Sequence, residues 1–113
     1  MQMRKDWYGI PHWLHVHLLP INYKNDLIHE YSERLYADLQ KRGILCLIDD
    51  RDLSPGVKFS DADLLGIPLQ LTLGEKNLKN HRVEIKQRRS GHKETIPLSK
   101  VTSLIKQLLS SGV

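Results

Sequence analysis

The sequence predicts an α/β protein with a mixed five-stranded sheet flanked by three helices. Two strand–helix–strand units follow one another from residue 14 to residue 73, and each implies parallel strands joined by a crossover. A short antiparallel hairpin with a basic tip comes next, and an amphipathic helix follows it. Parallel crossovers followed by a hairpin make the predicted sheet mixed.

The composition is that of an ordinary globular domain. Its 113 residues suffice for one hydrophobic core but not for a catalytic domain and a second domain together. The net charge of +4 permits a polyanionic partner. Cys46 is a lone cysteine in an apolar run, which favours a reducing cytoplasm. No apolar run approaches the roughly 20 residues that span a bilayer, so no membrane association is expected.

The domain is expected to occupy residues 14–113. Residues 1–13 mix charges, aromatics, glycine and proline without a period. We interpret them as a lead-in or as the remnant of an upstream connection. Residues 14–19 then alternate between apolar side chains and histidines, which predicts the first strand. His15 and His17 are expected on its solvated face.

The first crossover passes through an amphipathic helix. Apolar residues recur at three- and four-residue intervals from Leu27 to Leu39, and Gly43 is the expected end of this helix. Residues 44–48 are apolar at every position, as in a parallel strand that is covered on both faces. These segments predict a right-handed strand–helix–strand unit.

The second crossover has clear helix-end signals. Ser54 followed by Pro55 fits an N-cap and a first helical position, and Gly66 fits the helix end. Residues 69–73 alternate and predict the third strand, which a Gly-Glu-Lys-Asn turn follows.

The last third of the chain predicts a hairpin and a helix. Residues 82–87 and 93–96 are strand-like, and the basic segment 88–92 joins them. Ser99 is the expected cap of a helix that ends at Gly112.

An acidic cluster follows the second strand. Asp49, Asp50 and Asp52 lie where open α/β sheets bind their ligands, and such acids can hold magnesium for phosphoryl chemistry. Arg51 neutralises part of this charge, so capping and ion pairs with Arg51 or Lys58 are the favoured interpretation.

Other candidate chemistry is weaker still. His12, His15 and His17 could bind zinc or nickel, but no Cys, Asp or Glu beside them completes a tetrahedral set. An apolar strand would raise the pKa of Cys46, which argues against a nucleophile. Ser54 lacks a G-x-S-x-G frame, and neither G-x-G-x-x-G nor a Walker loop occurs. The sequence therefore predicts no active site and no cofactor in this chain.

Phe59, Asp63 and Lys76 suggest RNA binding. Phe59 and Asp63 are four residues apart on a predicted helix, so a ring and a carboxylate can address the same base. Proteins recognise unpaired RNA bases by stacking and by hydrogen bonds to the Watson–Crick edge. The two donors and one acceptor on that edge of guanine suit an aspartate and a lysine. Core packing of Phe59 and a solvated position for Asp63 remain the alternatives.

The run LIDDRDLSPGVKFSDADLLGIPLQLTLGEKNLKNHRVEIKQRRSG resembles the C-terminal anticodon-binding domain of bacterial-type prolyl-tRNA synthetase, a class IIa aminoacyl-tRNA synthetase. The similarity covers roughly residues 14–112. The succession DDR, PGVKF, LLGIP, LGEKNL and EIKQRRSG favours the prolyl branch over the histidyl, threonyl and glycyl enzymes. The resemblance implies the same mixed five-stranded sheet with three helices.

The resemblance also implies that the domain binds the anticodon loop of proline tRNA, whose second and third bases are guanines. By matched position, Phe59 packs on an anticodon base, Asp63 reads a guanine and Lys76 contacts a base. Gln70 stands at a position that is basic in some relatives. With the neighbouring and hairpin residues, the expected RNA-binding set is Phe59, Asp63, Lys76, Asn77, Lys93, Gln70, Lys58 and Arg89.

The resemblance bears on catalysis and partners as well. The family has class II catalytic motifs before the segment that begins at residue 14, and this sequence does not contain them. The chain is therefore expected not to charge tRNA by itself. ATP and magnesium would belong to a catalytic domain in cis, through which the synthetase forms a homodimer. An excised domain and a free-standing relative both remain open, as does an alternative function as a protein-interaction module without an RNA role.

Overall fold

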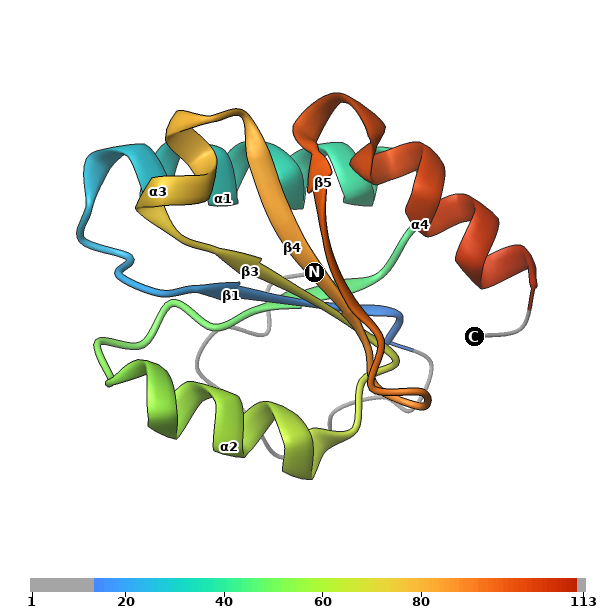
Figure 1. Cartoon of the computed structure of the whole chain (residues 1–113), viewed down its shortest axis with the longest axis horizontal. Helices are drawn as coiled ribbons and strands as arrows, with labels where there is room; N and C mark the ends of the chain where they lie inside the picture. Colours follow the sequence, from blue (N-terminus) through green and yellow to red (C-terminus); the bar gives the residue numbers. More distant parts are fainter. Residues whose placement is uncertain (1–13, 112–113) are drawn as a thin grey trace.

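Helices cover both faces of one sheet in the computed structural model, which describes residues 14–111 (Figure 1). The elements follow the chain as β1 (Val16–Pro20), α1 (Asp26–Lys41), β2 (Cys46–Ile48), α2 (Pro55–Leu65), β3 (Leu69–Leu73), α3 (Glu75–Lys79), β4 (Arg82–Gln87), β5 (Lys93–Pro97), the 3₁₀ turn η1 (Leu98–Lys100) and α4 (Val101–Ser110). The predicted lead-in, residues 1–13, and the predicted helix end at Gly112 lie outside the described residues.

The sheet is mixed, as predicted. Its strand order is β2-β1-β3-β4-β5. β1 pairs in parallel with both β2 and β3, and β4 and β5 extend the sheet by antiparallel pairing. The two crossover helices lie on opposite faces: α1 shares one face with α4, and α2 covers the other (Figure 1). The predicted α/β fold is therefore confirmed.

The main hydrophobic core lies between the sheet and the face covered by α1 and α4. Alternate residues of every strand point into it, because side chains along a strand point to opposite faces in turn. Its central members are Val16, Leu18, Cys46, Ile48, Leu69, Leu71, Val83 and Ile85 from the sheet, Ile28, Leu35 and Leu39 from α1, and Val101 and Ile105 from α4.

The other face of the sheet is largely polar. His17, Gln70, Lys86 and Lys93 lie in one row across β1, β3, β4 and β5. α2 covers the β1 end of this row, so that His17 is fully buried, whereas Lys93 at the other end is exposed. The predicted solvated face of the first strand is thus wrong for His17, because the crossover places α2 above it.

The ends of α2 match their sequence signals. Ser54 is the N-cap, and its side chain accepts a hydrogen bond from the Val57 amide at 3.4 Å. Gly66 adopts the left-handed conformation with φ of 69° and ends the helix. These local signals place α2 within the second crossover.

Two predicted details differ from the structure. The Gly-Glu-Lys-Asn segment forms the short helix α3 rather than a plain turn. Ser99 lies inside η1, and α4 begins after Lys100 without a capping hydrogen bond from a side chain. The predicted Ser99 cap is therefore wrong, because one 3₁₀ turn precedes the α-helix.

The buried His17 predicts a pH-dependent stability. Burial lowers the pKa of His17 from 6.5 to about 4; smaller effects come from Asp49, Arg51 and Asp61, of which the two carboxylates raise it and Arg51 lowers it. Between these values the unfolded chain binds the proton that the folded chain excludes. The free energy of unfolding should therefore decrease by roughly 3 kcal/mol as the pH falls from 6.5 to 4. Urea denaturation at about pH 6.5 and pH 4 measures this decrease.

His17→Gln provides the comparison, since glutamine does not titrate. The free energy of unfolding of the His17→Gln variant should change much less over the same pH interval. Arg51 keeps the pKa of Asp49 below 3.8, so the loss of this ion pair belongs to more acidic solutions. An equal decrease in both proteins would show that another group is responsible.

Candidate nucleic-acid interface

A pocket of about 270 Å³ opens between α2 and the polar part of the sheet. Four of the predicted RNA-binding residues, which come from three different elements, line it. These residues are Phe59 and Asp63 from α2, Gln70 from β3 and Lys93 from β5. The fold thus gathers residues that lie as far apart as positions 59 and 93 in the sequence.

Phe59 and Asp63 lie on the pocket side of α2. They are one helical turn apart, and the buried residues of the same helix are Lys58 and Ala62. Phe59 remains 36% exposed and belongs to neither hydrophobic cluster of the described residues. Core packing, the alternative for Phe59, is therefore not what the structure shows, and part of its ring is open to a ligand.

The floor of the pocket comes from alternate residues of β3 and β4. Thr72, Glu84 and Lys86 line it although the sequence analysis did not select them. Gln70 pairs with Lys86 and Thr72 pairs with Glu84, so the strand register places all four on one face. The period-two alternation of β4 could have indicated Glu84 and Lys86, but only once the partner strand was known.

The pocket offers both donors and acceptors. The Lys86 ammonium lies 3.8 Å from the Asp63 carboxylate, a loose ion pair that a ligand can replace. Gln70 is only 2% exposed, and its Nε2 has no hydrogen-bond partner among the described residues. Because Gln70 lines the pocket, this buried donor without a protein partner lies beside the space that a ligand would fill.

Three other predicted residues lie outside the pocket. Lys76 and Asn77 belong to α3, which buries Leu78 in the main core, on the face opposite α2. The Asn25 amide donates a hydrogen bond to Glu75, which also ties α3 to the start of α1. α3 directly follows β3, so Lys76 lies at the carboxyl edge of the sheet. Arg89 is exposed at the hairpin tip.

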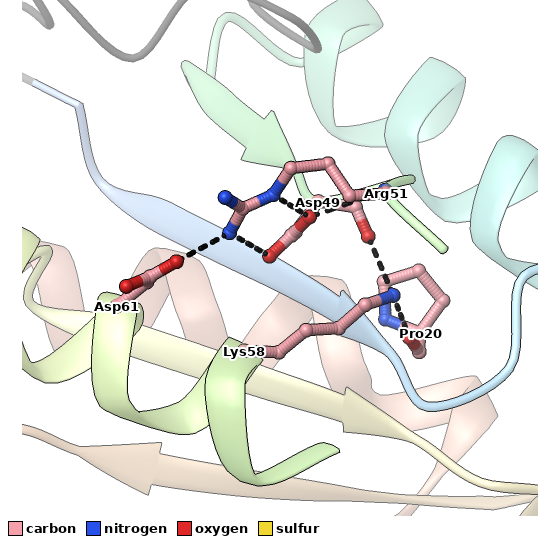
Figure 2. Close-up of polar contacts among 5 residues, drawn as sticks. All are labelled: Pro20, Asp49, Arg51, Lys58 and Asp61. Carbon is pink, nitrogen blue, oxygen red and sulfur yellow. Dashed lines mark hydrogen bonds and ion pairs between the residues drawn. The ribbon is translucent and has the colours of Figure 1, made fainter. Parts of the chain in front are cut away.

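The structure contradicts the predicted RNA contact of Lys58. This side chain is 1% exposed, and its Nζ donates hydrogen bonds to the carbonyl oxygens of Pro20 at 2.8 Å and Asp49 at 3.2 Å. Figure 2 shows the ammonium reaching from α2 toward the ends of β1 and β2. Adjacent helical residues point about 100° apart, which is why Phe59 faces the pocket while Lys58 is buried.

The acidic cluster forms ion pairs next to this lysine. Arg51 donates to both Asp49 carboxylate oxygens at 2.8 Å and to Asp61 on α2 at 2.9 Å (Figure 2). Burial alone would raise the pKa of Asp49, but the hydrogen bonds from Arg51 outweigh it and lower the pKa. The predicted ion pairing of Asp49 with Arg51 is confirmed. Residues 14–111 contain no cluster of three or more His, Cys, Asp or Glu suited to a metal.

Cys46 and the helix lengths bear on two further expectations, a reactive thiol and a membrane span. Burial raises the pKa of Cys46 to about 12, so its thiol stays protonated at neutral pH. None of the helices in the described part of the chain has the length and apolar composition needed to cross a bilayer.

The family model described as "Anticodon binding domain" matches residues 15–108. The chain belongs to this family. The match spans every strand and reaches into α4, so it includes all four predicted residues at the pocket.

Relatives of this anticodon-binding domain are named as proline–tRNA ligases. The enzyme of Endomicrobium trichonymphae is 44% identical over 92 residues, which are 81% of this chain and 16% of the relative. That of Desulfitobacterium hafniense is 41% identical over 99 residues, which are 88% of this chain and 17% of the relative. The predicted resemblance to prolyl-tRNA synthetase is confirmed, and the chain spans about a sixth of these relatives.

A solved structure shares the same fold. Prolyl-tRNA synthetase from Cryptosporidium parvum, in complex with L-proline and AMP, superposes with a TM-score of 0.79 at 26% sequence identity. The superposition covers 87% of this chain and 21% of that protein. The anticodon-binding domain described here therefore has the fold of one part of that synthetase.

The buried Lys58 predicts a loss of stability when its ammonium is removed. Lys58→Met retains most of the apolar side chain but leaves the carbonyls of Pro20 and Asp49 without their donor. We expect the free energy of unfolding to fall by about 1–3 kcal/mol in urea denaturation. Lys106→Met, on the exposed side of α4, is the matched control and should change it by less than about 0.5 kcal/mol.

Proposed function

We propose that this chain is the anticodon-binding part of a proline–tRNA ligase and that it reads the guanines of the proline anticodon. The pocket that joins Phe59, Asp63, Gln70 and Lys93 is the observation that carries the proposal. It combines an aromatic ring, a carboxylate and basic or amide donors, the groups that proteins use on unpaired bases. Family membership and the ligase relatives support the same function.

The proposed chemistry assigns one task to each wall of the pocket. Phe59 stacks on a guanine base, and the Asp63 carboxylate accepts hydrogen bonds from its N1–H and exocyclic amine. Lys93 or the Gln70 amide donates to O6. Lys86 neutralises Asp63 until the base arrives, which reduces the cost of holding a carboxylate beside a polyanion.

The proposed contacts continue beyond the pocket. Lys76 and Asn77, at the carboxyl edge of the sheet, bind a neighbouring nucleotide, and Arg89 at the hairpin tip neutralises phosphate. The net charge of +4 favours this association at low salt. Lys58 is not part of the proposed interface, because its ammonium is committed to two carbonyl oxygens.

The domain is proposed to bind tRNA without charging it. Aminoacylation, with ATP and magnesium, belongs to a catalytic domain in cis, and dimerisation takes place through that domain. The protein then acts in the cytoplasm. A protein-interaction role without RNA is the competing outcome, and RNA titration separates the two.

The proposed function predicts that binding depends on the identity of the anticodon bases. The full chain should bind an RNA stem-loop with the proline anticodon, and replacing either guanine by adenine should weaken binding by about 1–3 kcal/mol, because the donor and acceptor pattern is reversed. Fluorescence anisotropy at low salt measures both affinities. Equal affinity for the three RNAs would reject specific reading, and self-association without RNA affinity would favour the protein-interaction role.

The proposed function also predicts the effect of changing Asp63. Asp63→Asn places an amide donor opposite the donors of guanine and should weaken binding of the guanine loop by about 1–3 kcal/mol, with little effect on the adenine-substituted loops. Glu30→Gln, an equal change of charge on the exposed surface of α1, is the control. If both variants bind all loops alike, Asp63 is not the guanine reader.

A further inference from the structure

Within residues 14–111, the buried contacts of α2 lie along one of its sides. Toward β1 and β2, Lys58 and Ala62 are buried and Asp61 pairs with Arg51. Toward β4 and β5, the space between the helix and the sheet is the pocket itself. The width of the pocket therefore depends on the contacts that cross from the hairpin to α2.

Two side-chain polar contacts cross this space among the residues described. The Lys86 ammonium lies 3.8 Å from the Asp63 carboxylate, and the Arg88 guanidinium lies 3.4 Å from the Asp63 carbonyl oxygen. The two differ in what a ligand does to them. A base that binds the carboxylate competes with Lys86, whereas the contact of Arg88 with the main chain can persist when the base is bound.

Arg88 has a second contact at the same helix end. A Cβ added to Gly66 would lie 3.3 Å from both Cζ and Nε of Arg88, so the guanidinium packs closely over this glycine and a larger residue would crowd it. Gly66 also has a φ of 69°, and a cation at a helix C-terminus is favoured by the helix dipole. The Arg88 backbone amide also donates to the Pro68 carbonyl at 2.9 Å, which holds the backbone at Arg88 beside the segment that joins α2 to β3.

We propose that Arg88 is a positioning residue that ties the hairpin tip to the C-terminal end of α2 and so sets the distance of Asp63 from Lys93 across the pocket. The inference rests on the proposed function and adds a residue that determines specificity without touching the base. Arg88 holds Asp63 by its carbonyl, which leaves the carboxylate free to read the guanine. Gly66 provides the space for this contact.

Arg89 is the matched control for Arg88. It is the next residue, has the same charge and is also exposed at the hairpin tip. If Arg88 acted only as a cation near phosphate, removing either arginine would weaken all RNAs by a similar factor. If Arg88 positions Asp63, its removal should also reduce the discrimination between guanine and adenine loops.

The experiment compares the full chain with Arg88→Ala, Arg88→Lys and Arg89→Ala. For each protein, anisotropy gives the ratio of the dissociation constants for the adenine-substituted and the guanine stem-loops. We expect Arg88→Ala to lower this ratio roughly five- to tenfold, since small displacements of a reading group are costly, while Arg89→Ala leaves the ratio unchanged. Arg88→Lys should also lower it, because one ammonium cannot pack over Gly66 and reach the carbonyl together.

The outcomes separate this inference from the proposed function. A wild-type ratio near one rejects guanine reading and this inference with it. A high wild-type ratio that both Arg88 variants retain rejects only the positioning role. Thermal melting establishes which variants are folded, and Arg88→Lys decides the question if the alanine variant is not.

Discussion

The placement of α2 depends on one buried polar contact, the Lys58 ammonium between the carbonyls of Pro20 and Asp49. Burying a charge is costly unless its hydrogen-bonding capacity is met, and carbonyl oxygens at the ends of β1 and β2 supply these partners. Desolvation lowers the pKa of Lys58, and the neighbouring Asp49 opposes this effect. Arg51, which bridges Asp49 and Asp61, adds a second tie between the same loop and helix.

The pocket follows from the unequal covering of the two sheet faces. A helix is about 10 Å wide and strands lie about 4.8 Å apart, so a single helix covers about two strands. α1 and α4 together cover one face of the five-stranded sheet, whereas α2 is the one helix of the described residues on the other (Figure 1). β4 and part of β3 therefore expose polar side chains, and the edge of α2 with Phe59 and Asp63 becomes a wall.

Local signals account for what could be predicted. Alternation, helical periodicity and the Ser54 and Gly66 signals were sufficient for the five strands and for α1, α2 and α4, because each depends on neighbours in the chain, whereas the short helix α3 was predicted only as a turn. The pairing of Phe59 with Asp63 followed from helical spacing. Lys86 was missed because its place at the pocket depends on pairing with Gln70 in another strand, and Lys58 was misassigned because its partners lie 9 and 38 residues away.

The sequence by itself determined the order of the strands and of the three longer helices, the mixed sheet and the family, since motifs and periodicity are properties of the linear chain. Only the tertiary structure decided which polar residues meet. It buried His17 and Lys58 beneath α2, left Lys76 at the edge of the sheet and brought Lys93 to the pocket. The physical reason is that burial and proximity depend on strand register and on which face each crossover helix covers.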